Sequence, residues 1–280
     1  MVTSRRSKVL TGIATAIGVA VLVFWSLGPI YWVVVTSLKT AKEIYAFPPT
    51  LYPVVATFNN YRDALFKWNF GQFIYNSVVV AVTVTMLAVV IGALAAYPIA
   101  RLRFPGRALA ARTIVVSYLL PPSLLFIPLF IVLSRLGLID SKLGLVVAYL
   151  TFTVPFCTWL LIGYFRTIPI ELDEAALIDG ASRVQILRQV VLPIALPCIA
   201  VVALYAFTNS WNEFLYALVY VSSADAKTMT AGLTGLVMGD TFIWGQLMAS
   251  SVIGILPVLI IYLVAQRYLV EGLAAGSVKA

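Results

Sequence analysis

Charged residues divide the chain into long apolar runs and short connections, and this pattern predicts its elements. A charged side chain at the centre of a bilayer is costly, so charge-free runs indicate membrane spans. A helix needs roughly 20 residues to cross the hydrocarbon core. Six charge-free runs reach that length, over residues 9–38, 68–100, 113–134, 143–165, 189–212 and 241–266. The pattern predicts an all-α integral membrane protein with six transmembrane helices.

Within these runs we place the six helices at about residues 12–36, 72–99, 113–134, 143–165, 193–221 and 243–266. We expect residues 1–280 to form a single transmembrane domain, because no internal repeat or low-complexity tract interrupts them. The first run follows Arg5, Arg6 and Lys8, as the apolar core of a secretory signal would. It is longer than the roughly 7–15 residues of a signal core, so we predict an uncleaved span, with a removed leader as the alternative.

The distribution of basic residues predicts the orientation. Twelve of the 19 basic residues lie at the two termini and in the connections that follow the second and fourth runs, and seven lie on the other side. Cytoplasmic connections carry the excess of Lys and Arg in multi-pass proteins. We therefore expect both termini to be cytoplasmic.

Composition narrows the chemistry that the chain can perform. Hydrophobic residues make up 62% of it and charged residues 11%, less than half of what a soluble domain carries. It has no histidine and two cysteines, which excludes a Ser-His-Asp triad, a histidine metal cluster and a four-ligand zinc site. No Walker A sequence is present, so we expect no ATP to bind here. We predict no catalytic residue, no metal site and no cofactor on this chain, and no interaction with nucleic acid despite the net charge of +8.

The connection over residues 168–192 carries more structural signals than the other connections. Pro169 suits a first helical turn, and the acids at positions 171, 173 and 174 suit the positive end of a helix dipole. Gly180 suits the position after a helix end, and Ser182 with Gln185 forms a capping box. The pattern predicts two short helices. They could lie on lipid headgroups, but the acids disfavour the negative cytoplasmic leaflet and favour a basic protein partner.

The same connection contains a spaced motif. Glu174-Ala175-Ala176 is followed after three residues by Gly180, and after nine more by Val190, one residue and Leu192-Pro193. This resembles the Glu-Ala-Ala signature of ABC importer permeases, with Val190 where isoleucine is usual. Segments elsewhere, such as Trp211-Asn212-Glu213-Phe214, resemble permeases of maltose-type carbohydrate importers. The resemblance extends over nearly the whole chain and is greatest to the second, six-span permease of such importers.

The resemblance implies a type I ABC importer permease fold in a prokaryotic cytoplasmic (inner) membrane. It implies four kinds of partner: a second permease, two ATP-binding subunits that hold ATP and magnesium, an extracytoplasmic solute-binding protein, and a di- or oligosaccharide substrate. The motif would couple the chain to an ATPase, and the tail at Gly276 and Ser277 would reach the ATPase pair. The residues implied in coupling are Glu174, Ala175, Ala176, Asp179, Gly180, Leu192 and Pro193.

Polar residues in the apolar runs are candidates for lining a sugar pathway, because sugars need hydrogen-bonding groups and aromatic faces. The candidates are Asn76, Tyr205, Asn209, Asn212 and Glu213. The alternative for the neutral residues is hydrogen bonding between helices, and for Glu213 a pairing role near the membrane surface.

Three other functions stay open at this point. One is a permease of the same family for glycerol-3-phosphate or a glycerophosphodiester. Another is an ion-coupled secondary transporter, which should show internal repeats or ionisable residues at the midplane. A membrane-embedded enzyme should show clustered carboxylates, whereas Glu213 stands alone.

Overall fold

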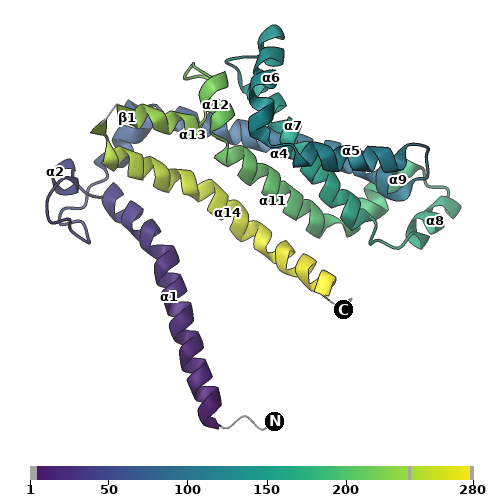
Figure 1. Cartoon of the computed structure of the whole chain (residues 1–280), viewed down its shortest axis with the longest axis horizontal. Helices are drawn as coiled ribbons and strands as arrows, with labels where there is room; N and C mark the ends of the chain where they lie inside the picture. The colour runs from purple at the N-terminus through teal and green to yellow at the C-terminus, as the bar shows by residue number, and fades with distance from the viewer. Residues whose placement is uncertain (1–4, 239–240, 278–280) are drawn as a thin grey trace. The chain divides into compact units, whose positions relative to one another are not determined.

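A computed structural model describes the backbone of residues 5–238 and 241–277 and the side chains of residues 12–237 and 242–266. The chain packs into two compact units (Figure 1): Met1–Phe70 with Gly235–Ile255, and Gly71–Thr234 with Leu256–Ala280. Helices dominate both units, as the sequence predicts. That the two units form the single domain expected from the sequence stays a prediction.

Four helices are long and apolar enough to cross a membrane by length and composition. They are α1 (Arg5–Ser37), α4 (Phe70–Arg101), α7 (Lys142–Phe165) and α14 (Trp244–Ser277). Two further candidates are pairs of helices bent at a short break, so the described residues hold up to six spans when each pair counts as one. This agrees with the six spans expected from the charge pattern.

The third predicted span is broken. α5 (Arg107–Leu119) and α6 (Pro122–Arg135) meet at an angle of 97°, so the expectation of one continuous helix over 113–134 is wrong. Pro121 and Pro122 explain the break, because the residue before a proline is driven out of the helical region. Leu120 is accordingly extended, with ψ 122°. Pro122 then starts α6, where its missing N–H costs nothing.

The fifth predicted span is also interrupted. α11 (Leu196–Asn212) ends at Glu213, whose backbone is extended, and α12 (Leu215–Tyr220) follows as a separate helix. The predicted helix over 193–221 is therefore interrupted at Glu213 and also at Ala195, just before α11. Before α11, α9 (Arg183–Ile186), a π-helical turn (Leu187–Val191) and α10 (Leu192–Ile194) bend away by 82°.

The remaining elements are short. The second unit also contains α8 (Glu171–Ile178) and α13 (Met229–Gly232), which leads into a 3-10 turn (Leu233–Leu236). The first unit contains α2 (Ala41–Ile44), α3 (Asn59–Arg62) and a π-helical turn (Asp63–Lys67). It also holds β1 (Val237–Met238) and β2 (Thr241–Phe242), which pair antiparallel.

A buried amide organises the first unit. The Nδ2 atom of Asn60 donates to the carbonyls of Ser37 (2.9 Å) and Lys39 (2.8 Å), just after α1 ends. Lys39 is itself buried and donates to the Thr50 carbonyl. Glu43 accepts from the Thr50 hydroxyl at 2.7 Å. These bonds fold the proline-rich connection back onto the end of α1.

The second unit has two apolar cores. The first core cluster joins α4, α7, α11 and the turn after α9, and the second joins α4, α6, α7 and α12. Small residues let α4 approach α7 closely: a Cβ added at Gly92 would lie 3.4 Å from the Cβ of Cys157. Fully buried members of the first cluster include Ala88, Ala96, Leu161, Phe165, Ile186 and Val202, and those of the second include Val84, Leu145 and Tyr149.

Candidate functional site

The segment over residues 168–192, named here the α8–α9 segment, forms the two short helices that its sequence predicts. Gly180 follows the end of α8 with φ +83°, a conformation that disfavours any side chain. Ser182 and Gln185 form the expected capping box at the start of α9. Pro169 differs from the prediction, because α8 begins at Glu171 and leaves Pro169 outside its first turn.

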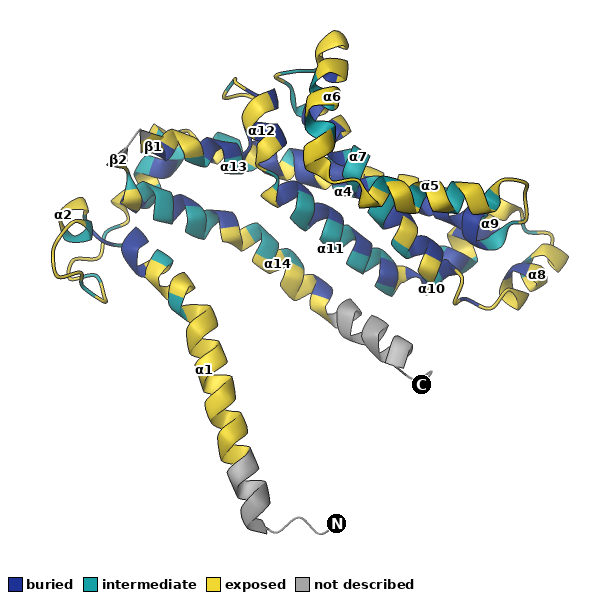
Figure 2. Ribbon diagram, viewed as in Figure 1, coloured by how far each residue is buried: buried dark blue, intermediate teal, exposed yellow. Residues whose placement is uncertain are grey.

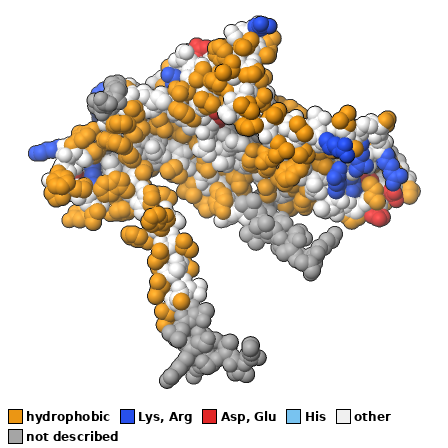
Figure 3. All heavy atoms as spheres, in the orientation of Figure 1, with side chains coloured by type: hydrophobic (Ala, Val, Ile, Leu, Met, Phe, Trp, Pro, Cys, Tyr) orange, Lys and Arg blue, Asp and Glu red, His pale blue; other side chains and the backbone are white. Residues whose placement is uncertain are grey.

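α8 presents its motif residues to the outside (Figure 2). Glu174, Ala175, Asp179 and Gly180 are exposed, and Ala176 is half-buried against the first core cluster. Large apolar side chains beside them are also uncovered, including Ile178 (87% exposed). Basic side chains gather at this end of the second unit, next to the acidic side chains of α8 (Figure 3). The exposed basic residues of this end are Arg103, Arg112, Arg166, Arg183 and Arg188.

Asp173 behaves differently from the other acids of α8. Its side chain is 1% exposed and pairs with Arg101, the last residue of α4, through Nη2–Oδ1 (2.6 Å) and Nε–Oδ2 (3.1 Å) contacts. The sequence predicts that Asp173, like the other acids of this helix, is available to a partner, and for Asp173 this prediction is wrong. Its neighbours Leu172 and Glu174 are exposed, so the helical periodicity could have indicated that Asp173 lies on the opposite, buried face. No local signal in the sequence identifies Arg101 as its partner.

The end of the motif lies where the α8–α9 segment turns into α11. Leu192 packs partly against the first core cluster, and Pro193 is exposed on α10. Proline cannot donate to the helical ladder, which fits the π-helical turn Leu187–Val191 that precedes it. The motif therefore runs from an exposed helix to the bend that precedes α11.

Three of the five predicted pathway residues line one groove of about 580 Å³ between α11 and α14. These three residues follow one another at intervals of one helical turn on α11: Tyr205, Asn209 and Asn212. The groove is also lined by Thr208 and Tyr262. The spacing on α11 could have identified Thr208, whereas Tyr262 comes from a distant part of the sequence. No charged residue is among the described lining, which is completed by Val201, Leu204 and Val258.

Asn76 does not line this groove. It is fully buried, and its Nδ2 donates to the carbonyls of Lys227 (2.9 Å) and Ala224 (3.3 Å). Its Oδ1 accepts from Gln72 (3.0 Å) and Lys142 (3.3 Å). All four hydrogen-bonding positions of the amide are therefore used within the protein, which favours the structural alternative over pathway lining.

Glu213 also lies outside the groove. Its two carboxylate oxygens accept from the backbone N–H groups of Tyr216 (3.0 Å) and Ala217 (3.1 Å), at the start of α12. The first N–H groups of a helix have no partner within it, so this carboxylate caps α12. This position favours a local pairing role for Glu213 over a role in lining the pathway.

The predicted tail residues Gly276 and Ser277 are the last two residues of α14. Their side chains fall outside those that the structure describes. Their contact with an ATPase stays a prediction.

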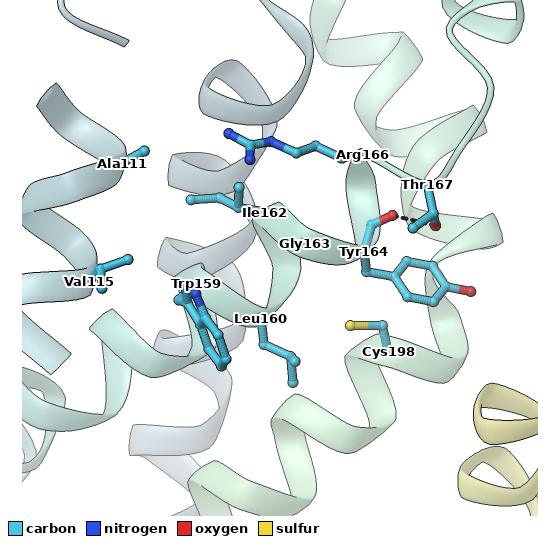
Figure 4. Close-up of a pocket in the computed structure, with 10 residues that line it drawn as sticks. All are labelled: Ala111, Val115, Trp159, Leu160, Ile162, Gly163, Tyr164, Arg166, Thr167 and Cys198. Atoms are coloured by element: carbon cyan, nitrogen blue, oxygen red, sulfur yellow. Dashed lines mark hydrogen bonds between the residues drawn. The ribbon is translucent and has the colours of Figure 1, made fainter. Parts of the chain in front are cut away.

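A second groove, of about 430 Å³, lies beside α7 (Figure 4). Its walls come from α5, α7 and α11, and they are mostly apolar, with Trp159 and Leu160 on one side and Arg166 near Thr167 on another. The Thr167 hydroxyl donates to the Tyr164 carbonyl at 2.8 Å. None of the predicted site residues line it. Within the described part of the chain, no group of three or more His, Cys, Asp or Glu side chains is placed to hold a metal ion.

Comparison with known proteins identifies the family. A family model described as "Binding-protein-dependent transport system inner membrane component" matches residues 88–274. An inner membrane ABC transporter permease protein of Escherichia coli (strain K12), YcjP, is 36% identical and covers 100% of both chains. The trehalose/maltose transport system permease protein MalG of Thermococcus litoralis is 34% identical, over 98% of this chain and 99% of its own length.

Solved structures show the same fold. A bacterial ABC transporter that imports the acidic polysaccharide alginate matches with a TM-score of 0.84 at 24% identity, over 96% of this chain and 99% of that chain. The alginate transporter in complex with its periplasmic protein matches with a TM-score of 0.68 at 15% identity, over 94% of each chain. The chain therefore belongs to the family of inner membrane components of binding-protein-dependent transport systems, and it is a multi-pass permease of the ABC importer type, a transport component of the cytoplasmic membrane.

Proposed function

We propose that the chain is one of two permeases in an ABC importer that moves a neutral di- or oligosaccharide into the cytoplasm by alternating access. Two ATP-binding subunits supply ATP and magnesium, and an extracytoplasmic protein delivers the sugar. The exposed α8 with its motif is the observation that carries this proposal. The chain is a mechanical component, and hydrolysis belongs to the ATP-binding partners.

The α8–α9 segment has the surface of a docking element. It exposes Glu174 and Asp179 next to Ile178, outside the long apolar helices. An exposed apolar patch with a polar rim is typical of a protein-binding surface. Seating α8 in a cleft of an ATPase would cover Ile178 and let Glu174 meet a basic partner residue. Gly180 would hold the turn, because its φ of +83° is open to few other residues.

The α11–α14 groove supports a sugar as the substrate. Asn209 and Asn212 offer amide donors and acceptors, and Thr208 offers a hydroxyl. The rings of Tyr205 and Tyr262 supply faces for the apolar patches of a sugar. The second permease would supply the opposite wall of the pathway.

The uncharged lining favours a neutral substrate. A phosphate, sulfonate or carboxylate group is normally met by Arg or Lys in a charge-assisted pair, and the described lining of the groove has neither. This observation disfavours glycerol-3-phosphate or a glycerophosphodiester. It also disfavours an ion-coupled secondary transporter, which would need an ionisable group there.

Uptake by the reconstituted importer, with its binding protein and ATPases, tests the proposal. We expect Glu174→Lys and Gly180→Pro to abolish ATP-driven sugar uptake. The first substitution places a cation where a basic partner residue is expected, and the second forces φ near −65° where +83° is needed.

Arg112→Glu is the control, because Arg112 is an exposed charged residue of α5 at the same end of the second unit, outside α8 and its motif. It should keep most of the uptake. The sugar affinity of the isolated binding protein should be identical in all cases. Wild-type uptake rates from both Glu174→Lys and Gly180→Pro would refute docking through α8.

A further inference from the structure

Arg101 connects the ends of three helices in the second unit. It is the last residue of α4, and its side chain is 3% exposed. Its Nη1 donates to the carbonyls of Phe165 (3.2 Å) and Ile168 (2.5 Å), at and just after the end of α7. Its Nη2 donates to Pro169 (2.8 Å) and to Asp173 Oδ1 (2.6 Å), and its Nε donates to Asp173 Oδ2 (3.1 Å).

These bonds satisfy three backbone carbonyls and one carboxylate that would otherwise lack a partner. The Phe165 carbonyl lies at the negative end of the α7 dipole, where a cation is favourable. The Asp173 carboxylate lies in the first turn of α8, where an anion is favourable. A guanidinium has five donors in a planar fork, so it can bind the carboxylate in a bidentate manner and still reach three carbonyls.

The rest of α8 has few attachments to the core. Its Leu172 (41% exposed), Leu177 (38% exposed) and Ile178 are uncovered, and Ala176 is its only described member that packs on the first core cluster. In Figure 1, α8 projects from the end of the second unit next to α9. The Arg101–Asp173 pair is the one salt bridge among the described residues. It therefore ties α8 directly to α4, whereas the covalent paths from α8 lead back to α7 through residues 166–170 and forward to α11 through α9.

We propose that Arg101 is a positioning residue that transmits movement of the docked α8 to α4, so that ATP-driven closure turns α4 together with α7 and α11. This inference rests on the proposed function, because it takes α8 as the docking element. Without the guanidinium, α8 could still bind an ATPase through Glu174, but its movement would reach the long helices only through the chain itself and the packing of Ala176. The defect would then be in coupling and not in docking.

The test uses the full importer in proteoliposomes, with sugar transported per ATP hydrolysed as the measurement. We expect Arg101→Gln to lower this ratio at least tenfold while hydrolysis continues. Asp173→Asn should lower it several-fold, because its neutral amide loses the bidentate ion pair but leaves the carbonyl bonds of Arg101. Arg101→Lys should fall between the wild type and Arg101→Gln, because an ammonium keeps the charge but not the fork.

Arg103→Gln is the control, since Arg103 is an exposed cation two residues further along. It should transport with the wild-type ratio. If neither the wild type nor Arg103→Gln transports any sugar, the proposed function fails instead. A wild-type ratio in both Arg101→Gln and Asp173→Asn would overturn the inference. So would loss of the assembled complex in both, because the pair would then serve assembly and not transmission.

Discussion

The two ends of the second unit use polar side chains for different purposes. At the end that carries α12, the polar residues Asn76, Asp140 and Glu213 all bind backbone groups of neighbouring connections. At the end that carries α8, the buried pair of Arg101 with Asp173 does this work, and the half-buried Arg107 donates to the carbonyls of Ile99 and Ala100. The remaining charged side chains there are exposed.

This difference separates anchors from surfaces that are free to bind partners. Connections between helices leave backbone groups that must find partners, and a nearby polar side chain is the usual solution. Near α12 three side chains are committed in this way. Near α8 the guanidinium of Arg101 satisfies three carbonyls and that of Arg107 two, which leaves Glu174 and its exposed neighbours available. Polar residues in apolar runs are therefore evidence of binding only where their own hydrogen bonds are left open.

Replacing Asn76 should produce the largest loss of stability. Asn76 is fully buried, and Asn76→Leu removes both the donor to the carbonyls of Ala224 and Lys227 and the acceptor for Gln72 and Lys142. Buried unsatisfied groups cost about 1–3 kcal/mol each, so we expect a loss of about 2–3 kcal/mol. Thermal unfolding of the purified complex in detergent measures it.

Asn209→Leu is the comparison for that variant. Asn209 is half-buried in the groove, so leucine should leave the unfolding temperature within a few degrees of wild type. If Asn76→Leu and Asn209→Leu destabilised the protein equally, the two asparagines could not be assigned different roles, one structural and one in binding.

Asn209→Leu should instead reduce sugar uptake. Losing one hydrogen bond to a neutral sugar costs about 1–1.5 kcal/mol, which corresponds to a loss of up to about tenfold in apparent affinity. Uptake measured against sugar concentration gives this value. Thr208→Val should act in the same direction and Val201→Ala should not, since Val201 offers no hydrogen bond. Unchanged uptake by Asn209→Leu and Thr208→Val would show that the transported sugar does not bind in this groove.

The sequence predicts the helices well where charge marks their ends and poorly where proline or a cap acts within a run. The charge-free run 113–134 hides the break at Pro121-Pro122, because a scan for charges does not register a backbone that cannot continue. Glu213 marks the end of α11, but its role as the cap of α12 depends on where two further N–H groups lie.

The candidate site was predictable to the extent that its signals are local. Gly180 and the capping box at Ser182 follow from the sequence, because turns and caps depend on adjacent residues. The Arg101–Asp173 pair joins positions 72 residues apart, and Tyr262 reaches the groove from another helix. Such contacts depend on how helices pack, which a single sequence does not contain.

Glu213→Gln should lower the stability less than Asn76→Leu does. Glutamine keeps one acceptor for the N–H groups of Tyr216 and Ala217 and loses the charge at the start of α12. Losing a cap of this kind costs about 0.5–2 kcal/mol. We expect a modest fall in unfolding temperature and no change in the sugar concentration that gives half-maximal uptake. A large change in that concentration would indicate that Glu213 lines the sugar pathway.

Asp140 should give the smallest effect, one that is present at neutral pH and lost in acid. Its Oδ1 accepts from the backbone N–H groups of Ser223 and Ser222, both at 2.8 Å, and these bonds lower the pKa of the carboxyl below its usual 3.8. A lowered pKa in the folded state stabilises the protein above about pH 4, and this stabilisation is lost as the pH falls through the folded-state pKa.

Asp140 is exposed, so solvent screens the charge and the effect should be a few tenths of a kcal/mol. Asp140→Asn keeps an acceptor oxygen but does not titrate. Its unfolding temperature should therefore be slightly below that of the wild type at pH 7, and the difference should shrink as the pH falls below about 4. A difference that grows as the pH falls would mean that the carboxylate does not anchor the connection after α12 in its charged form.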